Sequence, residues 1–265
     1  MRFSVLVCVS LLAAVILFAA CGGEEEKLPE QAAVTLTAAA EATQTATPSA
    51  PTPTAAAPSP TVRVTATPSP AAQEIAVVGS GFSIDEEGYY SYGVILANLS
   101  TGKAAERVDI NIGFYDEGGG VVATESDTVA VIFPGQRAAV AGFSSTEGAR
   151  PVQMKVQVRP TDWSSWDKAK PDFATTNVGV TPREYSGLVV TGEVANPFTK
   201  DLEDVKLVAI FYDAAGNITG GASTYQDFIP AGTSSPFEIT SFSEAPAARA
   251  EVFAQMSFLT LSAFD

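Results

Sequence analysis

The side chains in this sequence that could do chemistry are few, and the thiol of Cys21 is the most promising of them. The chain of 265 residues contains no histidine and two cysteines, Cys8 and Cys21. Histidine is the commonest general base and metal ligand, so its absence leaves those roles to carboxylates, as in a carboxylate-pair hydrolase. The carboxylate pairs Glu86-Glu87 and Glu203-Asp204 are adjacent in sequence, so their side chains diverge on a strand. The sequence has no phosphate-binding loop, dinucleotide fingerprint or nucleophile elbow. We therefore expect no enzymatic activity, no cofactor and no metal site.

The charge balance excludes another class of function. The chain carries 30 acidic and 15 basic residues, for a formal net charge of −15. A surface that binds nucleic acid needs clustered lysine and arginine to replace counterions on phosphate. The basic residues here are scattered, so we expect no nucleic-acid partner. The acidity is typical of a surface that stays soluble by mutual repulsion.

The amino-terminal segment explains why Cys21 is conspicuous. Residues 3–20 are almost wholly apolar, follow Arg2, and end in Ala19-Ala20 immediately before the cysteine, a pattern typical of a secretory signal. The segment 17–21 (LFAAC) resembles the lipobox of bacterial lipoproteins, with Phe18 where leucine is usual. The resemblance implies that residues 1–20 are a signal peptide and that Cys21 is lipidated, holding the protein outside the cytoplasm on the cell membrane. An uncleaved membrane anchor and plain secretion are the alternatives.

The segment behind the cysteine is a predicted linker. Residues 21–73 are dominated by alanine, threonine, proline and serine, and positions 22–73 contain no aromatic residue. Such a composition cannot bury enough apolar surface to offset the entropy of ordering the chain. We expect a disordered spacer, which at about 3 Å per residue could reach on the order of 150 Å. Its composition also allows O-glycosylation.

The remainder of the chain contains a tandem repeat. Residues 93–122 align with residues 190–218 with a one-residue gap. The matched positions are Asn98 with Asn196, Val108 with Val205, Phe114 with Phe211, Tyr115 with Tyr212, and Asp116 with Asp213. Internal repeats of this kind indicate duplicated structural units. We expect two domains, at residues 74–162 and 170–265.

Each copy has the pattern of β-structure. Apolar and polar residues alternate from Val108 to Phe114, as in a half-buried strand. In the second copy Val208 and Ile210 make the strand apolar on both faces. Turn-forming residues follow at 116–120 and 213–217. The sequence therefore predicts an all-β fold, with two tandem immunoglobulin-like β-sandwiches after the signal peptide and linker.

The repeated motif resembles that of the FxLYD domains, which are β-sandwich modules of secreted and lipid-anchored prokaryotic proteins. The resemblance rests on residues 112–116 (IGFYD) and 209–213 (AIFYD), and it covers about 74–160 and 172–262. Both copies depart from the motif, with Ile112 or Ala209 in place of its phenylalanine and Phe114 or Phe211 in place of its leucine. The resemblance implies the fold and the extracytoplasmic setting, and it implies no catalytic activity.

Two groups of residues are candidates for a functional site. The repeated Phe114-Tyr115-Asp116 and Phe211-Tyr212-Asp213 are expected to be structural, with the tyrosine at a strand end and the aspartate starting a turn. Trp163 and Trp166 lie between the predicted domains. They are expected to pack the domain junction, or to form a ligand-binding platform for carbohydrate or peptide together with Tyr89, Tyr90 and Tyr92. A third possibility is that they have no role.

These observations predict a non-catalytic, membrane-anchored lipoprotein of the cell envelope, whose folded part binds or displays an unknown ligand. The expected partners are the membrane, through the lipid anchor, and an envelope protein or glycan. One alternative is a structural spacer or an assembly subunit of an envelope complex. Another is a carbohydrate-binding lipoprotein that uses Trp163 and Trp166.

Overall fold

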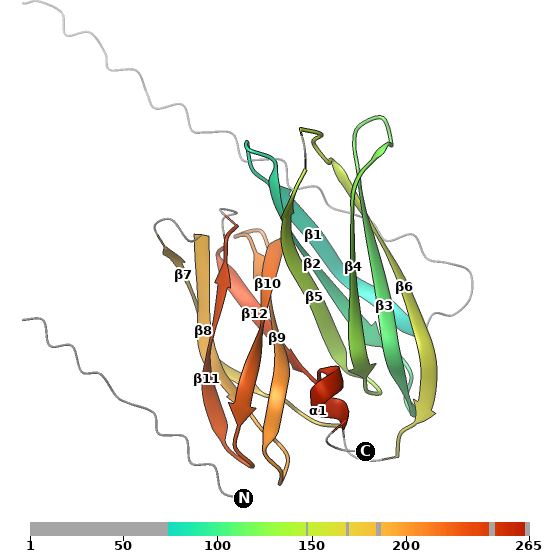
Figure 1. Cartoon of the computed structure of the whole chain (residues 1–265), viewed down its shortest axis with the longest axis vertical. Helices are drawn as coiled ribbons and strands as arrows, with labels where there is room; N and C mark the ends of the chain where they lie inside the picture. The colour runs from blue at the N-terminus through green and yellow to red at the C-terminus, as the bar shows by residue number, and fades with distance from the viewer. Residues whose placement is uncertain (1–73, 147, 168–169, 184–186, 244–246, 263–265) are drawn as a thin grey trace, which may run out of the picture. The chain divides into compact units, whose positions relative to one another are not determined.

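The computed structural model describes residues 74–146, 148–167, 170–183, 187–243 and 247–262 (Figure 1). This part of the chain forms twelve β-strands and one short helix, α1 (Phe258–Ser262). The strands pair antiparallel throughout. The predicted all-β fold of tandem sandwiches is therefore confirmed. The predicted signal peptide, the lipidation site Cys21 and the predicted linker lie outside the described residues.

The first repeat forms two three-stranded sheets that enclose a core. Sheet A has the strand order β1-β2-β5 and sheet B the order β4-β3-β6. The strands are β1 (Ile75–Ile84), β2 (Tyr89–Asn98), β3 (Lys103–Tyr115), β4 (Val121–Ile132), β5 (Arg137–Ser145) and β6 (Gln153–Ser165). Alternate apolar residues of both sheets meet between them, and Val94, Ile110 and Phe114 are among those buried there. This is the burial that the alternation from Val108 to Phe114 predicts.

The second repeat has the same architecture. Sheet C has the strand order β11-β8-β7 and sheet D the order β10-β9-β12. The strands are β7 (Thr175–Arg183), β8 (Gly187–Ala195), β9 (Leu202–Tyr212), β10 (Ile218–Ile229), β11 (Ser234–Ser241) and β12 (Arg249–Gln255). Val190, Leu207 and Phe211 lie in the core between the two sheets. Sheet D thus corresponds to sheet B of the first repeat, and sheet C corresponds to sheet A.

A third apolar cluster joins the two sandwiches. The outer face of sheet A contributes Ile95, Ala139 and Ala141, and the outer face of sheet D contributes Val208, Ile210, Tyr212, Ile218 and Phe253. Sheets A and D are therefore each covered on both faces, and the sheets follow one another in the order B, A, D, C. The position of Val208 and Ile210 in this cluster explains why β9 is apolar on both faces.

Glycines allow sheets A and D to approach closely. A Cβ atom added at Gly93 would lie 2.7 Å from the carbonyl oxygen of Gly220 on β10. Beside this point the hydroxyl of Ser91 accepts a hydrogen bond from the Gly221 amide at 3.0 Å and donates one to the Gly221 carbonyl at 3.1 Å. The side-chain hydroxyl thereby satisfies backbone groups that the contact removes from water.

Candidate functional site

The repeated asparagines hold the same turn in both sandwiches. Asn98 is buried, and its side-chain amide donates to the carbonyls of Lys103 and Ile132 at 2.8 Å each. Asn196 is also buried and donates to the carbonyls of Lys200 and Ile229 at 2.8 and 3.0 Å. In each case the side-chain oxygen accepts a backbone N–H two residues later. These residues therefore serve the fold, because they satisfy buried backbone groups.

The repeated aspartates have equally local roles. The Asp116 carboxylate accepts the amide of Gly120 at 2.8 Å, and the Asp213 carboxylate accepts the amide of Asn217 at 2.8 Å. The Asn217 side chain also donates to Asp213 at 2.9 Å. These bonds with Asn217 lower the pKa of the Asp213 carboxyl. Both aspartates thus accept hydrogen bonds within turns.

The repeats also share a backbone feature that side-chain patterns do not reveal. Arg107 has a φ of 45° and Asp204 a φ of 55°. Each residue directly precedes one of the matched valines, Val108 or Val205. Non-glycine residues rarely adopt this left-handed conformation. Its recurrence at equivalent places indicates that the duplication extends to local backbone geometry.

The two motif tyrosines lie in different surroundings. Tyr212 is buried between sheets D and A, donates a hydrogen bond to Glu251 at 2.7 Å and has the Arg249 guanidinium 3.6 Å from its ring centre. Burial, followed by the bond to Glu251, raises the pKa of Tyr212 to about 12. Tyr115 instead lies half-buried on the outer face of sheet B, with the Lys155 ammonium 4.2 Å from its ring centre. The same repeat position therefore lies in the interface between the sandwiches in the second copy and on an outer sheet face in the first.

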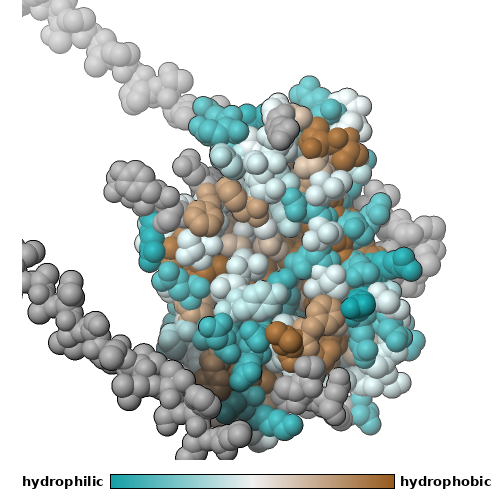
Figure 2. All heavy atoms as spheres, in the orientation of Figure 1, coloured by the Kyte–Doolittle hydropathy of each residue, from teal (hydrophilic) through white to brown (hydrophobic). Residues whose placement is uncertain are grey.

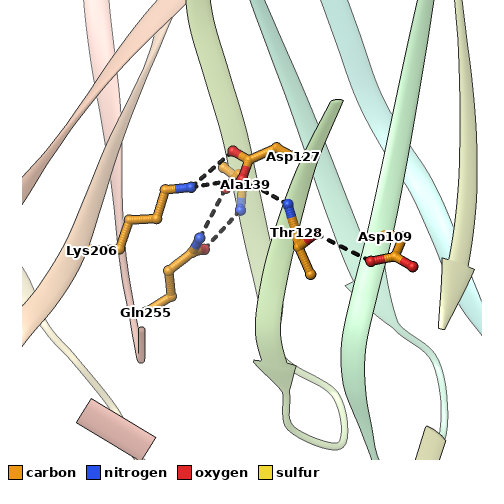
Figure 3. A network of polar contacts seen from close by, with 6 residues as sticks. All are labelled: Asp109, Asp127, Thr128, Ala139, Lys206 and Gln255. Atoms are coloured by element: carbon orange, nitrogen blue, oxygen red, sulfur yellow. Dashed lines mark hydrogen bonds and ion pairs between the residues drawn. The ribbon is translucent and has the colours of Figure 1, made fainter. Parts of the chain in front are cut away.

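Polar contacts lock the two sandwiches together beside the apolar cluster (Figure 3). The Lys206 ammonium on β9 reaches Asp127 on β4 at 2.8 Å. The Gln255 side chain bonds both the amide and the carbonyl of Ala139, each at 3.1 Å, on the edge strand of sheet A. Backbone groups that would otherwise be exposed on the β5 edge are thus capped by a side chain of the second sandwich.

The two tryptophans pack against different clusters. Trp163, on β6, is half-buried against the core of the first sandwich. Trp166 is half-buried against the cluster that contains the core of the second sandwich, and its ring lies 4.4 Å from that of Phe133. That cluster also includes Ala104 and Val131 of the first repeat, so Trp166 packs where the two repeats meet. Carbohydrate binding by these residues stays a prediction.

Tyr89, Tyr90 and Tyr92 do not share one surface. Tyr90 and Tyr92 are buried in the first core, which removes them from an exposed platform. Burial, followed by a hydrogen bond to Glu125, raises the pKa of Tyr90 to about 12. Tyr89 is exposed and stacks on Phe143 at 5.7 Å. Figure 2 shows that the apolar residues on the viewed face form separate patches among hydrophilic ones.

A hollow of about 400 Å³ lies on the outer face of sheet B. It is lined by Asn111, Ile112, Gly113, Tyr115, Thr124, Glu125, Ser126, Lys155 and Gln157. The volume is in the range of small-molecule sites. The repeated motif points to Tyr115 alone, because the other residues come from three strands and become neighbours only through cross-strand pairing.

The described part of the chain contains neither a metal-binding cluster nor a membrane-spanning helix. The described residues contain no group of three or more histidine, cysteine, aspartate or glutamate side chains that could hold a metal ion. No helix within the described ranges is long and apolar enough to cross a membrane. Comparison of the chain with protein-family models and with curated proteins found no match. The described region is a pair of antiparallel β-sandwiches joined by a buried interface.

Proposed function

We propose that this chain is a non-catalytic lipoprotein of the cell envelope, anchored by an acylated Cys21, that presents its β-sandwich pair as a binding module. In this proposal residues 1–20 are a cleaved signal peptide, and residues 21–73 are a spacer between the membrane and the folded region. The two sandwiches are FxLYD-type domains. The ligand is a component of the envelope, either a protein or a glycan.

The anchor is supported by the order of features along the chain. A hydrophobic segment ends in Ala19-Ala20-Cys21, a Pro/Thr-rich segment follows, and the β-region comes last. Each acyl methylene buried in the membrane contributes about 0.8 kcal/mol, so two or more chains suffice for stable attachment. Of the two cysteines, Cys8 lies inside the hydrophobic segment and is removed with it, which leaves Cys21 as the acylated residue.

One observation carries the binding role. The outer face of sheet D is covered by sheet A, whereas among the described residues the equivalent face of sheet B is exposed and contains the hollow. The repeat unit therefore has a face that contacts another surface in one copy and is free to do so in the other. A second candidate, a rigid spacer or assembly subunit, is favoured by the ion pair and hydrogen bonds that join the two sandwiches.

The anchor is tested by metabolic labelling with a fatty-acid analogue. Wild-type protein should be labelled, and Cys21→Ala should abolish the label because no acceptor thiol remains at the cleavage site. The matched control is Cys8→Ala, which should leave labelling unchanged. Label that persists in Cys21→Ala would refute the assignment.

The binding role is tested by cross-linking the full-length lipoprotein in intact envelopes. Asn111→Arg places a long charged side chain in the hollow without altering a buried residue. Envelope components that are cross-linked by wild-type protein and lost in Asn111→Arg support a binding module. Identical cross-linked products in both proteins would favour the spacer instead.

A further inference from the structure

We infer that the hollow on the outer face of sheet B is a saccharide-binding site. This inference rests on the proposed binding function and names the chemical class of its ligand. Two rows of paired residues cross the sheet here. Ser126, Asn111 and Gln157 form one row, and Thr124, Gly113 and Lys155 form the next. Neighbouring strands lie about 4.8 Å apart, so each row spans about 10 Å, comparable to two linked sugar rings.

The corresponding rows of sheet D show why the hollow exists. There the central residues are Val208 and Ile210, and Phe253 takes the place of Gln157. These three apolar side chains are buried against sheet A. In sheet B the same places hold Asn111, Gly113 and Gln157. The first copy thus has polar or absent side chains where the second has apolar docking residues, which suits a polar ligand and not a second sheet.

The polar side chains of the hollow have unused hydrogen-bonding capacity. Asn111, Thr124, Ser126 and Gln157 are exposed, and their side chains make no hydrogen bond to any other described residue. Side-chain amides both donate and accept, as do hydroxyls. Vicinal sugar hydroxyls need this combination, because each is a donor and an acceptor at once.

Tyr115 supplies an aromatic surface beside these groups. A Cβ atom at Gly113 would lie 2.9 Å from Cε2 of the tyrosine ring, so the ring rests where that side chain is missing. The Lys155 ammonium lies on the ring at 4.2 Å, and Lys155 is exposed. A cation–π contact at an exposed site is weak. A sugar ring can therefore displace the ammonium, stack on Tyr115 and accept a hydrogen bond from Lys155.

Other ligand classes fit this surface less well. The chain's net charge of −15 opposes nucleic acid. Six of the nine lining residues are Asn, Gln, Ser, Thr, Glu or Lys, which opposes an acyl chain. A peptide that adds a strand would use the backbone of a sheet edge, whereas these groups lie on a sheet face and include the central strand β3.

The test is a titration of the full-length mature lipoprotein in a detergent without a sugar headgroup. The probes are diacetylchitobiose and maltotetraose, which are neutral, and a hyaluronan tetrasaccharide, which is acidic. We expect at least one probe to bind with a Kd of about 1 mM or tighter in NMR titrations. Preference for the acidic probe indicates that Lys155 meets an acid group, and preference for a neutral probe indicates that it meets hydroxyls. Failure of all three to bind at about 10 mM overturns the inference.

Variants locate the site. Tyr115→Ala and Gln157→Ala should each weaken binding about ten-fold, equivalent to about 1.4 kcal/mol. Gly113→Ala should also weaken it, because the new methyl group displaces the tyrosine ring. The control Tyr225→Ala removes an aromatic side chain that is 53% exposed on β10 and should change nothing.

Two outcomes separate this inference from its alternatives. Binding that survives both Tyr115→Ala and Gln157→Ala but is lost in Trp163→Ala overturns the inference and moves the site to the tryptophans. The second outcome is that no saccharide binds, while Cys21 is still acylated and the cross-links still depend on the hollow. That result refutes only the saccharide as the class of ligand, and the proposed function stands. Gln157 is exposed, so its truncation does not threaten folding and keeps the test decisive.

Discussion

The close contact between sheets A and D makes Gly93 the most informative position for a stability test. In Gly93→Ala the new methyl carbon would lie 2.7 Å from the Gly220 carbonyl oxygen and 2.9 Å from Cδ1 of Ile210. The first of these atoms belongs to backbone and cannot rotate away. The substitution therefore forces the two sandwiches apart at their shared face.

The expected cost follows from two opposing effects. Overpacking a tight interface by a methyl group costs about 1–3 kcal/mol. Replacing a strand glycine by alanine raises the free energy of unfolding by roughly 0.5–1 kcal/mol, because alanine loses less backbone entropy on folding. Gly93→Ala should therefore lower the free energy of unfolding by about 0–2.5 kcal/mol, with a central value of about 1 kcal/mol.

The assay is urea denaturation of the mature chain, with unfolding monitored by tryptophan fluorescence and circular dichroism. The control is Gly179→Ala on β7, where the nearest atom to a new Cβ is the Thr191 hydroxyl at an ordinary 3.8 Å. This control should be neutral or slightly stabilising. If Gly93→Ala is as stable as Gly179→Ala, the sheets are not held together at this point and our account of the interface is wrong.

Two further predictions concern the buried polar groups. Asn196→Ala should destabilise the chain by about 1–3 kcal/mol, because it leaves the buried carbonyl of Ile229 without its side-chain donor; an unchanged midpoint of thermal unfolding would contradict this role. Alkaline pH should also destabilise the fold. The pKa values of Tyr90 and Tyr212 are raised from 10.0 to about 12, so their contribution is fully present below pH 10 and is lost as the pH rises towards 12. Absorbance at the tyrosinate band, recorded with circular dichroism, checks this, and ionisation of all tyrosines near pH 10 in still-folded protein would refute it.

Local features of the sequence were sufficient for the elements and their turns. Alternation from Val108 to Phe114 predicts a strand with one buried face, because successive side chains point to opposite sides. Asp116 and Asp213 predict turns, because a short carboxylate bonds amides a few residues away. These interactions act within a few residues, so a single sequence contains what is needed to infer them.

The sequence indicated one of the two surfaces that form the interface between the sandwiches. Val208 and Ile210 showed that β9 is covered on both faces, but nothing local indicated which surface covers it. The partner surface comes from Ile95, Ala139 and Ala141, which lie about 70–115 positions away in the sequence. Pairing over that distance depends on which faces remain open after each sandwich has formed.

The candidate site depended on tertiary structure for the same reason. Tyr115 and Tyr212 occupy one repeat position, yet one lines an open hollow and the other is buried in an interface. The difference comes from cross-strand neighbours, such as Gln157 in place of Phe253, and from what each sheet face meets. Sequence by itself determined the duplicated β-units and the motif that recommends Cys21 as an anchor. The outer faces of sheets B and D are equivalent in the two repeats. Only the tertiary structure decided that the face of sheet D packs against the other sandwich and that the face of sheet B stays exposed, because face-to-face packing is set by complementary surfaces and not by local periodicity.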